Sequence, residues 1–199
     1  MAKIQKNPLN CVAHPLNNVN YKKLNGFVAI DKTCALFFEI ITNPQLFVAD
    51  IRQLADIAHK AGVPLIADTT IVPFSTFHAA DFGVDIEVVS SKKYISGGGT
   101  GLGGLLIDYG QFDWSQSPSP ALQARTKRVG KELAFTARVK TELITNLGGL
   151  MTPQVAYMET LGLDTHDAVV GLVSHKRHIA LCDFIVHHNY FKIKLIIQA

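Results

Sequence analysis

Short strand-like segments alternate with helical patterns in the first half of the chain, and this alternation constrains the fold more than any other feature. Asp50 and Gln53 have capping-box spacing and open an amphipathic helical pattern that ends at Gly62. Strand-like runs surround this pattern, at residues 34–41, 64–67, 86–89 and 103–109. Such alternation at short intervals predicts an α/β fold, with a mostly parallel sheet covered by helices on both faces.

Polar side chains follow three of the expected strands. Asn43 follows the first strand, Asp68 ends the second, and a segment from Ser90 to Lys93 follows the third. In open α/β sheets, ligands collect at the carboxyl ends of the strands, so these residues are candidates for a binding site. A lysine placed there, beside hydroxyl groups and the glycines of residues 97–104, can bond covalently to an aldehyde cofactor whose phosphate lies next to it.

Each of these residues also has an ordinary structural explanation when it is taken alone. An aspartate after a strand is usually a turn or cap residue, an Asn-Pro pair such as Asn43-Pro44 is usually a turn, and a Lys-Lys pair is usually solvated surface. The glycines do not fit a Walker loop, because no Gly-Lys-Ser/Thr follows at the required spacing. Only the combination of these residues at strand ends favours a site.

Four segments together resemble a known family, the Cys/Met metabolism enzymes that depend on pyridoxal 5'-phosphate (PLP), or trans-sulfuration enzymes. The sequences of these segments are most similar to the O-acetylhomoserine sulfhydrylase branch of the family. The resemblance covers roughly residues 27–184. Intervals of 25 residues from Asn43 to Asp68 and from Asp68 to Lys93 also match the family. The segments are Glu39–Pro44, Ala67–Thr70, Ser90–Tyr94 and Gly97–Gly104.

The resemblance implies a role for each candidate residue. Lys93 would bind the cofactor aldehyde covalently and, once freed, move protons between substrate carbons. Asp68 would face the pyridine nitrogen and keep it protonated. Ser90 would bind the phosphate, and Asn43 would hydrogen-bond near the ring hydroxyl or the substrate carboxylate. The implied fold is the large domain of aminotransferase fold type I.

The implied reaction belongs to methionine and cysteine biosynthesis. It is a γ-replacement in which an activated homoserine ester, of the O-acetylhomoserine type, reacts with sulfide to give homocysteine. Within this class of transferases and lyases, γ-lyase or cystathionine chemistry is the neighbouring alternative. A second alternative is a catalytically inactive truncated remnant, or an inactive subunit of such an enzyme. The family assembles as homo-oligomers, and we expect the same here if the chain is functional.

The chain also departs from the family pattern. Lys92 stands where the family has a small hydroxyl residue, although a lysine there could still pair with phosphate as a point charge. We expect three parts: an irregular segment at 1–26 without family resemblance, the core of the PLP-binding domain at 27–162, and a long helix in 163–199 leading toward an absent C-terminal domain. The chain is thus expected to be a central fragment of such an enzyme.

The remaining sequence features exclude several other classes. The formal net charge of +3 is too weak to indicate nucleic-acid binding, and no apolar run is long enough to span a membrane. Three cysteines without paired spacing and scattered histidines argue against disulfides and metal, and favour a cytoplasmic location. Trp114 is expected in a loop, either at the surface or in interface packing. Further elements are expected as helices at 135–147, 153–162 and 164–186, and an unpaired strand at 190–197.

Overall fold

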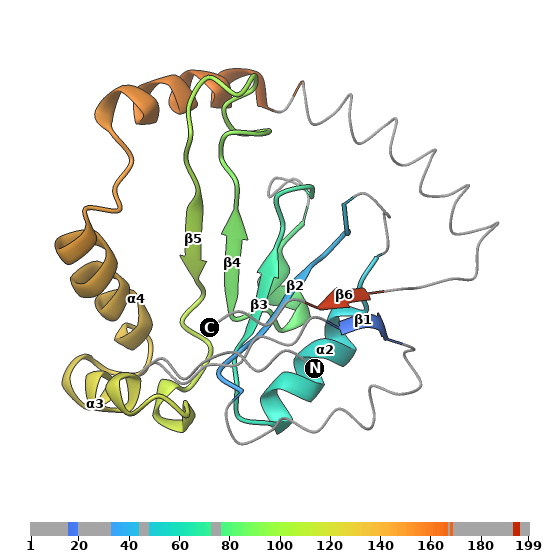
Figure 1. Ribbon diagram of the computed structural model, residues 1–199, viewed down its shortest axis with the longest axis vertical. Helices are drawn as coiled ribbons and strands as arrows, with labels where there is room; N and C mark the ends of the chain where they lie inside the picture. The colour runs from blue at the N-terminus through green and yellow to red at the C-terminus, as the bar shows by residue number, and fades with distance from the viewer. Residues whose placement is uncertain are drawn as a thin grey trace.

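The computed structural model describes residues 16–19, 33–43, 48–72, 77–166, 168 and 193–195. Within these residues the centre is one sheet, with the strand order β1-β6-β2-β3-β4-β5 (Figure 1). Its strands are β1 (Leu16–Val19), β2 (Leu36–Glu39), β3 (Leu65–Asp68), β4 (Ile86–Val89), β5 (Leu105–Asp108) and β6 (Ile193–Leu195). The helices are α2 (Ile51–Lys60), η1 (Ala79–Phe82), η2 (Trp114–Gln116), α3 (Pro120–Val129), α4 (Ala134–Val139), η3 (Lys140–Thr145) and a further helix over 153–166.

The predicted α/β fold is confirmed, with parallel strands at the centre of the sheet. β2, β3 and β4 run parallel, and their register places Asp68 opposite both Glu39 and Val88. The outer strands β5, β6 and β1 join antiparallel. For β5 the reason is its connection, because residues 90–104 contain no crossover helix that could return the chain to the same end of the sheet.

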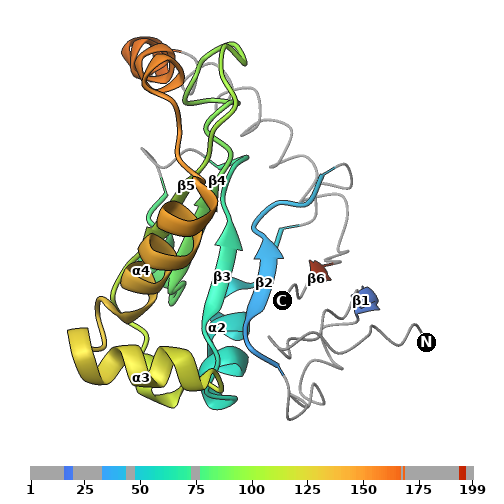
Figure 2. The same cartoon turned by 60° about the vertical axis from the view of Figure 1, so that its left-hand side comes forward.

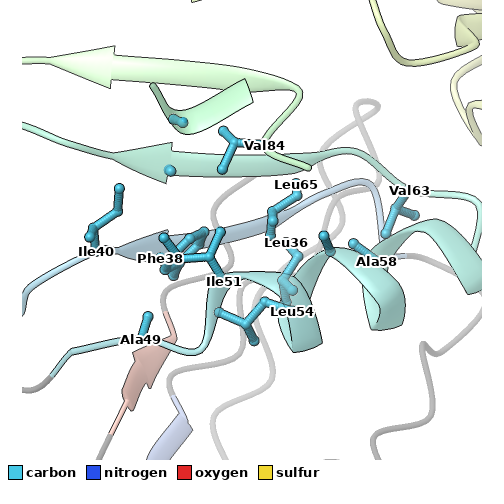
Figure 3. Close-up of a cluster of buried hydrophobic side chains, with 13 residues drawn as sticks. Leu36, Phe38, Ile40, Ala49, Ile51, Leu54, Ala58, Val63, Leu65 and Val84 are labelled. Carbon is cyan, nitrogen blue, oxygen red and sulfur yellow. The ribbon is translucent and has the colours of Figure 1, made fainter. Parts of the chain in front are cut away.

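Helices cover both faces of the sheet, as predicted. On one face α2 packs against β2 and β3, and the buried side chains include Leu36, Phe38, Leu54, Ala58 and Leu65 (Figure 3). The alternate residues of β3 and β4 turn to the other face, where Ile66 and Ile86 pack with Phe112, Trp114 and Ala134. In both overall views α3 and α4 lie toward β4 and β5, on the side away from β1 and β6 (Figures 1 and 2). Burying each large apolar side chain contributes about 1.5–3 kcal/mol relative to exposure.

The predicted start of α2 is confirmed by its cap. Asp50 Oδ1 accepts a hydrogen bond of 3.1 Å from the backbone N–H of Gln53, which satisfies one of the free donors of the first turn. At the other end, the backbone at Gly62 has φ of 69°, a conformation that favours glycine. This cap and this turn bring the chain from β2 back to the start of β3.

Several sequence expectations are wrong in detail. The helix expected to end at Gly162 continues to residue 166. Within it, the missing side chain at Gly162 allows close contact with the Ile95–Ser96 backbone. Trp114 is 2% exposed rather than at the surface, since it stacks on Phe135 and meets Phe112 edge to face.

The two ends of the chain also differ from expectation where they are described. Residues 16–19 were expected to be irregular and instead form β1. The segment expected as an unpaired strand contributes β6, which pairs with β1 and β2. The rest of the long helix expected from residue 164 onward lies outside the described residues, apart from residues 164–166 and 168, which are helical. Among the described residues, no helix has both the length and the apolar character needed to cross a membrane.

Candidate functional site

The candidate site lies at the carboxyl ends of three neighbouring parallel strands. Asp68 is the last residue of β3, and its register partners Glu39 and Val88 are at the ends of β2 and β4. Ser90 is the first residue after β4, and Asn43 follows β2 by four positions. The fold therefore brings the sequence-predicted residues to one edge of the sheet, where parallel α/β proteins bind ligands.

Thr70 joins two of the predicted residues directly. Its backbone N–H donates a hydrogen bond of 2.9 Å to Asp68 Oδ1, and its Oγ1 accepts one of 2.8 Å from the backbone N–H of Ser90. Thr70 is buried, both bonds are partly buried, and together they orient the Asp68 carboxylate and the start of the segment after β4. The motif Ala67–Thr70 contained this residue, but sequence reasoning assigned it no role.

Lys93 lies in a turn of residues 91–96, which we call the lysine turn. Lys92 and Lys93 are exposed, whereas Ser91 and Ser96 on either side are buried. The Ser96 N–H donates to Ser91 O at 2.8 Å, and the Lys93 N–H donates to Ser90 O at 3.3 Å. The turn is therefore buried at Ser91 and Ser96, and between them the two lysine side chains remain accessible to a ligand.

The hydroxyl of Ser96 stabilises the C-terminal part of the lysine turn through two hydrogen bonds. Ser96 Oγ donates to Lys92 O at 2.5 Å and accepts from the Gly99 N–H at 3.0 Å. The backbone at Gly97 and Gly99 has φ of 69° and 70°, which only glycine adopts at little cost. The glycines after the lysine therefore serve first to fold this turn tightly, next to the strand ends.

Asn43 is the most peripheral of the predicted residues. It is exposed, and its backbone N–H donates to Glu39 Oε2 at 3.1 Å. Glu39 is in turn the register partner of Asp68, so this bond places the Asn43 backbone near the end of β2.

A small cavity lies behind Ser90. Its volume is about 10 Å³, which suits a water molecule. The cavity is lined by Thr70, Val72, Val89, Ser90, Tyr94, Ile95 and His166.

The acidic and phenolic groups with raised pKa values lie away from the candidate site. Burial raises the pKa of Asp85, although bonds from the Leu65 N–H (2.7 Å) and His59 Nε2 (2.8 Å) oppose this effect. Burial and the hydrogen bond to Glu87 likewise raise the pKa of Tyr109. Asp85 precedes β4 and Tyr109 follows β5, so both residues lie at the opposite edge of the sheet and belong to the fold.

The donor set at the strand ends fits PLP in its chemistry. Asp68 supplies a half-buried carboxylate suited to a protonated pyridine nitrogen, Ser90 a hydroxyl suited to phosphate, and Lys93 an exposed primary amine. Lys92 adds a second exposed cation to this edge. No group of three or more metal-binding side chains comes together anywhere in the described part of the chain.

Comparison with known proteins agrees with this chemistry. The sequence model of the family "Cys/Met metabolism PLP-dependent enzyme" matches residues 3–190, so the match begins upstream of the resemblance seen from the motifs. The homocysteine/cysteine synthase of Saccharomyces cerevisiae is 33% identical over 146 residues, which are 68% of this chain and 33% of that protein. The chain therefore spans about a third of the length of this relative.

Comparison with solved structures also finds PLP-dependent enzymes of this family. The chain matches the O-acetylhomoserine sulfhydrylase of Wolinella succinogenes with a TM-score of 0.63 and 39% identity, over 74% of this chain and 41% of that one. It also matches a putative O-acetylhomoserine (thiol)-lyase from Campylobacter jejuni that contains a pyridoxyl-lysine, with a TM-score of 0.61 and 29% identity. The second match covers 75% of this chain and 38% of that one.

Proposed function

Because the chain belongs to the Cys/Met metabolism PLP-dependent enzyme family, we propose that the carboxyl ends of β2, β3 and β4 carry its cofactor site. Its fold is that of the PLP-dependent transferases of fold type I. The observation that carries the proposal is the buried Thr70, which ties Asp68 to Ser90 beside the exposed Lys93. A carboxylate, a hydroxyl and a free amine are thereby held at one ligand-binding edge.

In this proposal each residue acts through its own chemistry. Lys93 would hold the cofactor through its aldehyde group, and the lysine amine would move a proton between substrate carbons. Asp68 would keep the pyridine nitrogen protonated, and the bond from the Thr70 N–H orients its carboxylate. When bound, PLP supplies a ring that withdraws electrons from the substrate carbon.

The two remaining residues bind rather than react. Ser90 would donate its hydroxyl to the phosphate, and Asn43 would hydrogen-bond near the ring hydroxyl or the substrate carboxylate. Lys92, exposed next to Lys93, could pair with the phosphate as a point charge. A lysine in place of a small hydroxyl residue thus exchanges a directed hydrogen bond for a less directional charge interaction.

The proposed reaction is γ-replacement on an activated homoserine ester, with sulfide as the second substrate and homocysteine as the product. Two similar proteins support this reaction class, because one is named homocysteine/cysteine synthase and the other O-acetylhomoserine sulfhydrylase. We propose γ-lyase or cystathionine chemistry as the alternative within the class. A cytoplasmic location and a homo-oligomer belong to the same proposal.

A catalytically inactive protein is the second candidate, and a specific observation favours it. Lys92 stands where the family has a small hydroxyl residue, so a charge replaces the directed hydrogen bond of that hydroxyl. A less directed contact would position the cofactor, and with it the substrate, less precisely, which lowers the rate of the chemical step. In this case the chain would bind the cofactor without turning over substrate.

The test uses the two neighbouring exposed lysines as a matched pair. The purified chain is incubated with PLP, reduced with borohydride and digested, and the pyridoxyl group is located by mass spectrometry. We expect the label on Lys93, its loss in Lys93→Ala and its retention in Lys92→Ala. Equal labelling of both lysines, or labelling that survives Lys93→Ala, would contradict the proposed site.

Activity is then measured as homocysteine formed from O-acetyl-L-homoserine and sulfide. Sulfide-dependent homocysteine that disappears in Lys93→Ala supports γ-replacement. A labelled Lys93 without homocysteine supports the inactive alternative. Release of a keto acid without sulfide would instead favour lyase chemistry.

A further inference from the structure

The helix over residues 153–166 presents one face to the lysine turn. Glu159, Gly162 and His166 are spaced three and four residues apart, which places them on the same side of a helix. Each of them contacts a different part of the turn, namely Ser91, the Ile95–Ser96 backbone and Tyr94. One helix therefore touches the lysine turn on both sides of Lys92 and Lys93.

The first of these contacts is a buried hydrogen bond. Ser91 Oγ donates to Glu159 Oε1 at 2.8 Å, and the two residues are 0% and 5% exposed. Gly103 closes over the pair, since a Cβ there would lie 2.6 Å from Glu159 Oε1 and 2.7 Å from Ser91 Oγ. A carboxylate so enclosed depends on protein donors instead of water, so loss of its bond is costly.

The other two contacts hold the far half of the turn. A Cβ at Gly162 would lie 2.3 Å from Ile95 O, so the backbones of the helix and the turn are in direct contact there. Toward the end of the helix, His166 Nδ1 lies 3.3 Å from Tyr94 O, within hydrogen-bonding distance. These contacts limit the turn to small movements relative to the helix.

We propose that Glu159 is a positioning residue for Lys93, acting through the buried Ser91 hydroxyl. The inference rests on the proposed role of Lys93. Both lysine side chains are exposed, so the buried residues on either side set where their backbone lies. Ser91 is the nearest of these on the strand side, and its hydroxyl bond to Glu159 spans 68 residues of sequence. Glu159 thereby holds the start of the turn in the conformation that presents Lys93 at the strand ends.

The test compares Glu159→Leu with Glu159→Gln, which keeps an oxygen that can accept from Ser91. One measurement is PLP binding to Lys93 across a pH series. The other, made without cofactor, is hydrogen exchange of the Ser96 amide, which bonds to Ser91 O. We expect Glu159→Leu to weaken PLP binding about tenfold and to speed exchange about tenfold, because one hydrogen bond to a charged group is lost.

Three variants make the comparison with Glu159→Leu specific. Glu159→Gln should restore most of both values, which a change of packing alone would not explain. Glu142→Gln, at a half-buried glutamate that pairs with Arg138 and does not contact the lysine turn, should change neither. If Glu159→Leu does not fold, the double variant Ser91→Ala/Glu159→Leu replaces the bond with apolar contact, and it should fold and still bind PLP more weakly.

Normal PLP binding and normal Ser96 exchange in Glu159→Leu, or normal PLP binding in the double variant, would overturn the inference. Failure of the proposed function has a different signature, which is absence of the Lys93 label in the unaltered chain. In that case Ser96 exchange in Glu159→Leu still decides whether Glu159 holds the turn.

Discussion

Replacing Gly162 with alanine tests how closely the helix must approach the lysine turn. In an isolated helix this change is favourable, since alanine is preferred over glycine by about 1 kcal/mol. Here a Cβ would lie 2.3 Å from Ile95 O and 2.6 Å from Ser96 O. Ordinary contacts of a Cβ begin near 3.4 Å, so the helix and the turn must separate by about 1 Å.

The expected magnitude follows from three opposing contributions. Overpacking a close contact costs about 1–3 kcal/mol, and displacing the helix weakens the Ser91–Glu159 bond by about 1–2 kcal/mol. The helix preference of alanine returns about 1 kcal/mol. We therefore expect Gly162→Ala to lower the free energy of unfolding by about 1–4 kcal/mol. PLP binding at Lys93 should weaken as well, because the turn moves.

Urea unfolding followed by circular dichroism and by the fluorescence of the buried Trp114 measures the change. Gly98→Ala is the matched control, since a Cβ there would meet only Thr100 Cγ2 at 3.9 Å. We expect the control to stay within about 0.5 kcal/mol of the unaltered chain. An unfolding free energy of Gly162→Ala equal to or above that of the unaltered chain would refute the reasoning.

Two further predictions concern the core and its buried acid. Leu54→Ala should lower the unfolding free energy by about 2–5 kcal/mol in urea titrations, because Leu54 is fully buried between α2 and the sheet. Leu147→Ala is the control, and it should change the unfolding free energy little because Leu147 is 74% exposed. Burial raises the pKa of Asp85 above its usual 3.8, so the folded state holds this proton more tightly than the unfolded state does. The stability from this group is present below that value and is lost as pH rises through the folded pKa. Unfolding measured from pH 4 upward, in the unaltered chain and in Asp85→Asn, should show the variant gaining relative stability as pH rises, whereas a constant difference would contradict this.

The strands that carry the site were predictable because their signals are local. The apolar runs that became β2, β3 and β4 end within one or two residues of their expected positions, and the Asp50 cap starts α2 where predicted. Asp68 and Ser90 were recognisable from their place after these runs. Parallel direction followed from the helix between β2 and β3, since such a crossover returns the chain to the same end of the sheet.

The errors arose where one part of the chain overrides the local preference of another. Gly162 is a normal helix stop in sequence, yet the helix continues through it, and the glycine there instead permits close packing on Ile95 and Ser96. Trp114 lies in a segment rich in serine and proline, and its packing against Phe112 and Phe135 makes it a core residue. Such outcomes depend on contacts that no local pattern encodes.

The sequence by itself determined the family, the order of the strands along the chain and the residues that can bear the chemistry, because periodicity and motif spacing are properties of neighbouring residues. Only the tertiary structure decided which of those residues meet. Thr70 joins Asp68 to Ser90, and Glu159 reaches Ser91 across 68 residues. Contacts over such separations form when strands align and a helix packs on them, so packing of the whole chain selects them.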